Sequence, residues 1–382
     1  MSPTANINIQ LPLKILYNTD QIFLHGGIEK VMATKANYFA SQNGVEVYIV
    51  TTEQGQNAGC YPLDEKIKLI DLGVDYNRSK SYFSGENLRK AFLHFKKQRK
   101  LFKELQPDVI ISPNYNFDHY WLPFIFSRAK VIKERHSSRF FEAKQRNKTS
   151  LKTKLLFWFN DYIDGLYDRI IVLNEDEKTY VNSGNAFVIP NPVEHTNLYA
   201  DLSKKQVLAA GRISPVKAFD QLIEAWALIQ LDFPDWQLHI YGQDYLGTQE
   251  KLEQLVAKHD LHSVLKFKGS VNNLLETMTD YSIYAMTSDT ECFPMVLLEA
   301  LSVGMPVVSY DSPNGPRNIL IDGEDSFLTP SKNIPIFAEK LKILMENANL
   351  RCEMGGKGMK NVERFSLEKV MQQWKDLFQS LR

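Results

Sequence analysis

Residues 288–311 read SDTECFPMVLLEALSVGMPVVSYD, and the rest of the chain is organised around this stretch. The apolar run Ser282–Met286 just before it predicts a strand. Pro294 lies where a first helical turn tolerates proline, and Gly304 with Pro306 ends the helix. The pattern therefore predicts a loop, a helix of about three turns, and a second strand.

Two glutamates mark this segment, Glu291 in the loop and Glu299 inside the helix. Five helical residues advance about 7 to 8 Å, close to the distance from a pyrophosphate to the hydroxyls of its ribose. The backbone amides of Phe293, Met295 and Val296 would face the phosphates, and Glu299 would bind the ribose. The structural alternative makes Glu291 a first-turn acid facing the helix dipole and Glu299 an ordinary helix-face carboxylate.

Glu299 lies among apolar residues, and a carboxylate in such a helix needs a partner. With the loop ECFP and the following EALSVGMPVVSYD, the segment resembles the retaining glycosyltransferases of family 4, which have the GT-B fold. The resemblance implies an α/β protein with two Rossmann-like, doubly wound parallel-sheet domains facing across a cleft, and a C-terminal helix that crosses back to the first domain. It also makes Glu291 catalytic and adds Pro294 to the donor-binding residues. Cys292 departs from the family's usual glycine or serine, which leaves the sugar open.

Composition indicates an ordinary globular protein of two or three domains, with 382 residues, 44% hydrophobic and 24% charged. The net charge is zero, but residues 1–190 hold 26 Lys and Arg against 20 Asp and Glu, leaving 19 against 25 after them. This asymmetry favours an anionic partner for the first half, either a membrane surface or a nucleic acid. The three cysteines lack metal-ligand spacing and suit a reducing compartment.

A cytoplasmic location is expected, because no apolar run approaches the ~20 residues of a membrane span and residues 1–10 lack a basic, apolar signal segment. Two basic tracts interleaved with phenylalanine, Glu86–Leu105 and Arg135–Lys154, favour a peripheral position on the inner face of the membrane. The bland alternative is a solvated helix that packs its phenylalanines inward. No nucleic-acid-binding signature accompanies the charge, so no nucleic-acid partner is expected.

The first half alternates strands, beginning near residues 13, 45, 66, 109, 129, 169 and 186, with helices or loops, which predicts a doubly wound parallel sheet. We place the first domain at 1–191, the second at 192–364 and the crossover helix at 365–382. Gly26 and Gly27 precede a helix and are weak evidence alone; the resemblance places their loop over the donor phosphates and sugar. His136 follows a strand and is more often structural, but the resemblance places it near the donor sugar and acceptor.

The second domain begins with the strand Gln206–Ala210, followed by Gly211, Arg212 and Lys217. Two cations at the carboxyl edge of a sheet suit a diphosphate clamp, which also matches the family pattern; the alternative is two solvated charges. The resemblance puts the nucleobase near residues 269–272, with Gly269 and Val271 as contacts.

The predicted function is retaining transfer of a hexose or N-acetylhexosamine from a nucleotide diphosphate sugar, with UDP favoured by the family, to a saccharide acceptor. The acceptor is expected to be lipid-linked, in the synthesis of cell-surface polysaccharide or glycan. Neither a cofactor nor a metal is expected, because no Asp-x-Asp motif is present and Arg212, Lys217 and the helix amides could stabilise the leaving diphosphate. The alternatives are a GT-B nucleotide-sugar epimerase, a GDP-sugar-dependent transferase and a non-catalytic sensor. An oxidoreductase is disfavoured, because no G-x-G-x-x-G follows a strand.

Overall fold

The computed structural model describes residues 13–81, 83–113, 116–126, 128–146 and 150–381. Residues 1–10, expected to lack an export signal, lie outside the described residues, as do 147–149 of the second basic tract. The chain forms two compact units. Unit 1 comprises Met1–Pro190 with Val370–Arg382, and unit 2 comprises Asn191–Lys369. The boundaries expected from the sequence fell after residues 191 and 364.

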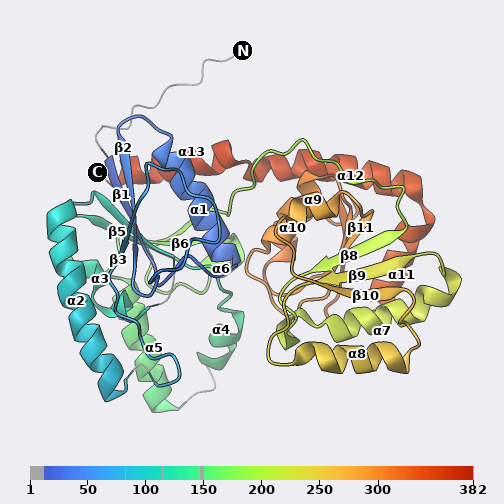
Figure 1. The fold of residues 1–382 in the computed structure, drawn as a ribbon, viewed down its shortest axis with the longest axis horizontal. Coiled ribbons are helices and arrows are strands. Elements are labelled where there is room, and N and C mark those ends of the chain that lie inside the picture. The colour runs from blue at the N-terminus through green and yellow to red at the C-terminus, as the bar shows by residue number, and fades with distance from the viewer. Residues whose placement is uncertain (1–12, 82, 114–115, 127, 147–149, 382) are drawn as a thin grey trace. The chain divides into compact units, whose positions relative to one another are not determined.

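Unit 1 contains a parallel sheet whose seven strands, counted over its described residues, lie in the order β3-β2-β1-β4-β5-β6-β7 (Figure 1). The inner strands are apolar along their length and buried on both faces, as parallel sheets require. The strands are β1 (Leu13–Asn18), β2 (Val45–Thr51), β3 (Lys68–Asp71), β4 (Val109–Ser112), β5 (Lys130–Glu134), β6 (Arg169–Val172) and β7 (Ala186–Val188).

The helices of unit 1 lie between its strands in the chain, and several of them bury aromatic and aliphatic side chains against the sheet. They are α1 (Gly27–Ala40), α2 (Gly85–Leu105), the short η1 (Phe117–Tyr120), α3 (Leu122–Ile125), α4 (Phe140–Arg146), α5 (Leu151–Asp164) and α6 (Glu175–Lys178). The last helix, α13 (Leu367–Ser380), begins in unit 2, and from Val370 onwards it belongs to unit 1. Its Phe378 ring lies 5.4 Å from that of Phe39 in α1.

Unit 2 contains a second parallel sheet, with six strands over its described residues in the order β10-β9-β8-β11-β12-β13. The strands are β8 (Gln206–Ala210), β9 (Gln237–Tyr241), β10 (Leu265–Gly269), β11 (Ile283–Met286), β12 (Val307–Tyr310) and β13 (Ser326–Thr329). Strand β13 is not predicted from the sequence, because its four residues, SFLT, carry too little apolar pattern to identify a strand. Two parallel, doubly wound sheets confirm the predicted fold class.

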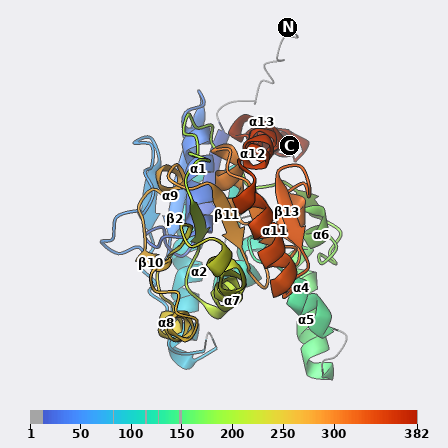
Figure 2. The ribbon, with the colours of Figure 1, turned by 90° about the vertical axis from the view of Figure 1, so that its right-hand side faces the viewer.

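Helices cover both faces of this sheet, with α7, α8 and α11 packed together on one face and α9, α10 and α12 on the other (Figures 1 and 2). The helical segments are η2 (Pro215–Lys217), α7 (Phe219–Ile229), η3 (Gln230–Asp232), α8 (Thr248–Lys258), α9 (Leu274–Met278), α10 (Met295–Ser302), η4 (Pro316–Asn318), α11 (Ile334–Glu346), α12 (Ala348–Val362) and η5 (Glu363–Phe365). The prediction of about three turns for α10 was wrong, since the helix has eight residues. Pro294 is the residue before the helix rather than part of it, and Gly304 follows with a φ of +74°.

No helix in the described part of the chain is both long and apolar enough to cross a bilayer.

Candidate active site

The sheet of unit 2 changes direction between β8 and β11, which are neighbours in the sheet but far apart in sequence. From β8 the chain builds outward to β9 and β10, and it then returns to β11 on the other side of β8. The loops after these two strands therefore leave in opposite directions, and open α/β sheets bind ligands at such a point. The two loops, residues 211–218 and 287–294, carry six of the eleven predicted donor-binding residues of unit 2.

An ion pair joins the two loops: the Nζ atom of Lys217 lies 2.6 Å from Oε1 of Glu291. The side chains are 20% and 14% exposed, so the pair is reachable by a ligand. Gly211, with a φ of +155°, lets the lysine lie across the end of β8, because a Cβ atom there would come within 2.9 Å of Lys217 Cε. The structure thus brings together Gly211, Lys217 and Glu291, three predicted site residues from two loops.

Further hydrogen bonds fix the two loops against each other. The Thr287 hydroxyl donates to the carbonyl of Ala218 at 3.0 Å, and the amide of Asp289 donates to the carbonyl of Val216 at 2.8 Å. The lysine and the glutamate therefore extend from backbones that are already held in place.

A third loop, which follows β12, supports Glu291 from behind. The Glu291 amide donates to the carbonyl of Pro313 at 3.1 Å, and the Asn314 amide donates to the carbonyl of Glu291 at 3.2 Å. Gly315 packs against the same residue, since a Cβ atom there would lie 2.7 Å from Glu291 Cβ and 2.8 Å from Pro294 Cδ. The sequence analysis missed this role of Asn314 and Gly315, for which the glycine within the loop DSPNGPR was the available signal.

Helix α10 begins beside Glu291 with Pro294 at its N-cap and no side-chain hydrogen bond on its first turn. Met295 and Val296 are half-buried there, and their amides belong to the group that a helix N-terminus leaves without intrahelical partners. The Phe293 ring is buried and lies 5.3 Å from the ring of Phe365, so only its backbone is available to a ligand. Glu299 is buried on the fifth position of the helix.

The remaining predicted residues of unit 2 are exposed. The Arg212 guanidinium lies 5.0 Å from the ring centroid of Tyr245, and among the described residues it has no carboxylate partner. Gly269 and Val271 follow β10, the edge strand, and Gly269 accepts a hydrogen bond from the amide of Gly242 at 2.9 Å. Arg212 and Lys217 share a loop, although the lysine is held by Glu291 and the arginine by an aromatic ring.

In unit 1, Gly26 and Gly27 lie where the loop after β1 enters α1. Gly26 is the N-cap of that helix and has no side-chain hydrogen bond. Glu29, in the first turn, accepts a hydrogen bond from Gln21 Nε2 at 2.8 Å, and burial raises the pKa of its carboxyl group. This hydrogen bond joins the start of the loop to the first turn of α1. The two glycines remain exposed or half-exposed.

His136 lies two residues beyond the end of β5, and its Nε2 atom lies 2.9 Å from Oε2 of Glu134. The same carboxylate contacts Lys35 Nζ, at 2.6 Å from Oε1. Neither Glu134 nor Lys35 is among the site residues predicted from the sequence. Lys35 was detectable, because it interrupts the apolar face of VMATKANYFA in the way that Glu299 interrupts its own helix.

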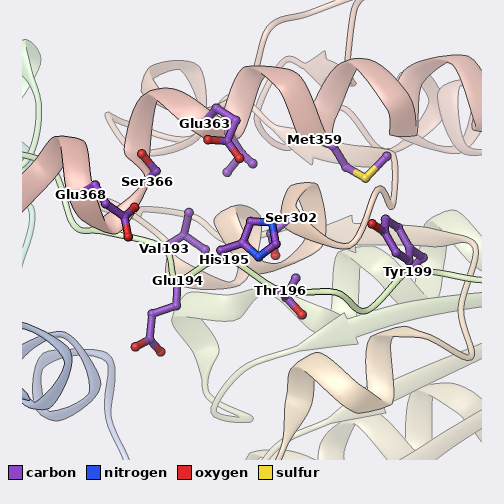
Figure 3. Close-up of a pocket in the computed structure, with 11 residues that line it drawn as sticks. Val193, Glu194, His195, Thr196, Tyr199, Ser302, Met359, Glu363, Ser366 and Glu368 are labelled. Carbon is purple, nitrogen blue, oxygen red and sulfur yellow. The ribbon is translucent and has the colours of Figure 1, made fainter. Parts of the chain in front are cut away.

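A cavity of about 140 Å³ lies elsewhere in unit 2, between the segment 193–199 and the junction of α12 with α13 (Figure 3). Its side chains include Glu194, His195 and Glu363. None of the predicted site residues lines it among the described residues, and it is smaller than the ~300 Å³ or more of typical ligand pockets. We therefore do not assign the donor to this cavity.

Among the described residues, no group of three or more His, Cys, Asp or Glu side chains is arranged to hold a metal ion. Two acids of the loop 287–294 are engaged by lysines, Glu291 by Lys217 and Asp289 by Lys332 at 3.5 Å.

Comparison with known proteins identifies the family of the chain. Residues 25–197 match the family described as Glycosyltransferase Family 4, and residues 192–361 match Glycosyl transferases group 1. An uncharacterised glycosyltransferase of Haemophilus influenzae is 28% identical over 360 residues, covering 92% of this chain and 96% of its own length. The amylovoran biosynthesis glycosyltransferase AmsD of Erwinia amylovora is 24% identical, covering 95% of this chain and 99% of its own.

Among solved structures, that of the pneumococcal O-GlcNAc transferase GtfA in complex with UDP and GlcNAc aligns with a TM-score of 0.75. The alignment covers 97% of this chain and 99% of the other, at 14% identity, so it bears on the fold alone. The two family matches together extend from residue 25 to residue 361. The chain therefore belongs to the family 4 glycosyltransferases, and its two units are those of the GT-B fold.

Proposed function

We propose that this glycosyltransferase moves a hexose or N-acetylhexosamine from a UDP-sugar to a saccharide acceptor, with retention of configuration and without a metal. The observation that carries the proposal is the Lys217–Glu291 pair at the β8/β11 switch point, beside a helix N-terminus without a side-chain cap. A cation and free amides at one point suit the charge that develops on a leaving diphosphate.

The ion pair suggests how the lysine acts. Glu291 places the Lys217 ammonium, and a bound diphosphate would share that ammonium with the carboxylate. Because the pair is only partly buried, its rearrangement costs little desolvation. In this proposal Arg212 is the second cation of the clamp, and Glu291 also stabilises the positive charge that grows on the sugar.

The rest of the donor is assigned by position. Glu299 lies along α10 from the phosphate end and would bind the ribose, and the exposed Gly269 and Val271 would contact the base. In unit 1, His136 would bind a sugar hydroxyl or guide the acceptor, and Gly26 with Gly27 would lie over the phosphates and sugar. UDP is favoured because GtfA, which shares the fold, was solved with UDP and GlcNAc. A surface-glycan acceptor is favoured because AmsD serves amylovoran biosynthesis.

Incubation with single donors, without an acceptor, tests the reaction class. The proposal predicts slow release of free sugar from UDP-GlcNAc or a UDP-hexose, unchanged by EDTA, with the α-anomer formed first. A changed sugar that remains linked to the nucleotide would identify an epimerase, and preference for GDP-mannose would identify a GDP-sugar transferase. The first result would overturn the assignment of sugar transfer, and the second would overturn the assignment of UDP as the nucleotide.

We further propose that unit 1 docks on an anionic membrane, where a lipid-linked acceptor resides. The predicted helix α2 uses part of its charge internally, since Lys90 donates to the carbonyl of Asp75 at 2.6 Å and Lys97 to that of Leu72. The second tract is divided between α4 and α5. Helix α5 exposes an apolar surface that includes a stripe formed by Leu151, Leu155, Trp158 and Tyr162, which are 85%, 63%, 63% and 55% exposed; Leu156 and Phe159 beside it are 51% and 41% exposed.

The spacing of these residues, four then three then four, puts them on one side of the helix, with Lys152 and Lys154 close by. Such a helix suits the interface of an anionic bilayer. Cosedimentation with vesicles rich in phosphatidylglycerol should fall for Trp158→Glu. It should not fall for Leu231→Glu, which changes an 87%-exposed leucine of unit 2. Equal binding by both variants, or binding to neutral vesicles alone, would contradict the proposal.

A further inference from the structure

The cluster around His136 is a buried chain of three ionisable groups. Both carboxylate oxygens of Glu134 contact the ammonium of Lys35, at 2.6 and 2.5 Å, and one of them also contacts Nε2 of His136 at 2.9 Å. The side chains of Lys35, Glu134 and His136 are 3%, 1% and 5% exposed. Water therefore competes little for these contacts.

The contacts decide which nitrogen of the histidine carries hydrogen. Burial alone would raise the pKa of Glu134, but Lys35 and His136 outweigh it and lower that pKa to about 2. An ionised carboxylate can only accept hydrogen bonds, so Nε2 of His136 must be the donor. In a neutral imidazole the other nitrogen, Nδ1, is then the acceptor.

The lysine is itself held from three elements of unit 1. It extends from α1 to the end of β5, and its ammonium lies 4.5 Å from the ring centroid of Trp374 in α13 and 5.8 Å from that of Tyr17 in β1. The aromatic faces and the carboxylate together fix one position for the charge. Glu134 therefore cannot turn away from His136 without leaving Lys35 unpaired.

The charged groups that act on His136 come from more than one element. The carboxylates are Glu134, at the end of β5, and Glu29, in the first turn of α1. Tyr17, buried and with its pKa raised by burial and by Glu134, stays neutral. The cation is Lys35 of α1, which contacts both oxygens of the Glu134 carboxylate.

We propose that Glu134 and Lys35 are positioning residues for His136. Glu134 fixes the imidazole with Nε2–H directed into the protein, so that Nδ1 is the acceptor of the neutral form, and Lys35 fixes the Glu134 carboxylate that does so. A neutral Nδ1 can accept a hydrogen bond from a sugar hydroxyl, so the inference rests on the proposed function of His136. Neither Glu134 nor Lys35 need touch the substrate.

Histidine NMR of the free protein tests this without any nucleotide. In ¹⁵N-histidine-labelled protein, with the signal assigned by its loss in His136→Asn, the neutral form should be the Nε2–H tautomer. Glu134→Gln removes the negative charge and leaves Lys35, so the pKa of His136 should fall by about one unit or more. Lys35→Met leaves Glu134 without its cation, so the pKa should rise by about as much.

Opposite shifts distinguish positioning from a structural role, which would move both variants in one direction or neither. Lys375→Met is the matched control. Its ammonium also joins α13 to α1, 2.9 Å from the Tyr38 hydroxyl, but contacts no carboxylate among the described residues. It should leave the His136 titration unchanged. An Nδ1–H tautomer in the wild type, or shifts of the same sign in Glu134→Gln and Lys35→Met, would overturn the inference.

Activity measurements separate this inference from the proposed function. If the wild type turns over a UDP-sugar, the acidic limb of its pH profile should move down in Glu134→Gln and up in Lys35→Met. If no UDP-sugar reacts while the NMR shifts have opposite signs, the proposed donor fails and the positioning chain stands. Should a variant fail to fold, Glu134→Asp, which retains the charge on a shorter side chain, should partly restore the wild-type tautomer, and its failure to do so would count against the inference.

Discussion

Each unit carries a lysine–glutamate pair near the carboxyl edge of its sheet, and in each the Nζ–Oε1 distance is 2.6 Å. The Lys217–Glu291 pair of unit 2 is 20% and 14% exposed, whereas the Lys35–Glu134 pair of unit 1 is 3% and 1% exposed. Equal distances therefore accompany different roles. A partly exposed pair can exchange its partner for a ligand, but a buried one cannot do so without a large desolvation cost.

The largest expected effect is on the stability of the buried pair. Lys35→Met leaves the Glu134 carboxylate buried without its cation, and we expect the free energy of unfolding of unit 1 to fall by about 3 to 5 kcal/mol in urea denaturation. Lys217→Met removes the same kind of charge from the exposed pair and should change stability by about 1 kcal/mol or less. Equal losses in the two variants would remove the distinction drawn between the pairs.

For catalytic activity, we expect the larger effect at the exposed Lys217–Glu291 pair. Lys217→Met should lower kcat for sugar transfer or donor hydrolysis by about 100- to 1,000-fold, because a cation at the leaving diphosphate is lost. Lys204→Met is the control, since Lys204 forms an exposed ion pair with Asp201 in the same unit, at 3.7 Å. A Lys217→Met enzyme with wild-type kcat would exclude the lysine from the reaction.

A smaller effect is expected behind Glu291. Gly315→Ala places a methyl group against Glu291 and Pro294, and because hydrogen bonds hold Glu291 on both sides, the side chain must shift. We expect a loss in kcat of up to about 100-fold. Gly356→Ala is the matched control, since nothing lies within 4 Å of the added Cβ atom and Gly356 is inside α12. Its activity should be unchanged, and a similar loss there would show that Gly315 has no special role.

The smallest expected effect is the pH dependence of the stability that the buried Lys35–Glu134 pair contributes. The pKa of Glu134 is about 2 in the folded protein against an ordinary value of 4.5, so its contribution to stability is fully present above pH 4.5. It is lost as the pH falls from there towards about 2. The difference in Tm between wild type and Glu134→Gln should shrink as the pH falls from 4.5 towards about 2. A difference that disappears by pH 5 would contradict the assigned pKa.

Much of unit 2 could be predicted because its signals are local. The apolar strands, Pro294, and the interval from Glu291 to Glu299 lie within one short segment, and a carboxylate in an apolar helix is conspicuous. The same segment carried the family resemblance, which the comparisons confirm.

The missed features depend on residues that are distant in the chain. Lys35 and Glu134 are 99 positions apart, and only the sheet topology places α1 against β5. Gly315 supports Glu291 through a loop that follows a different strand. The apolar residues of the α5 stripe are visible in the sequence. Their exposure depends on which side chains pack on them, and the periodicity of the sequence does not show this.

The central claim is that the switch point of unit 2 binds the diphosphate of the donor. Calorimetric titration of UDP, with EDTA present, into wild type, Lys217→Met and Lys204→Met tests it most directly. We expect wild type and Lys204→Met to bind alike, and Lys217→Met to bind at least about tenfold more weakly, the effect of losing one charge-assisted hydrogen bond. Equal affinity in all three proteins, or no UDP binding by the wild type, would contradict the assignment.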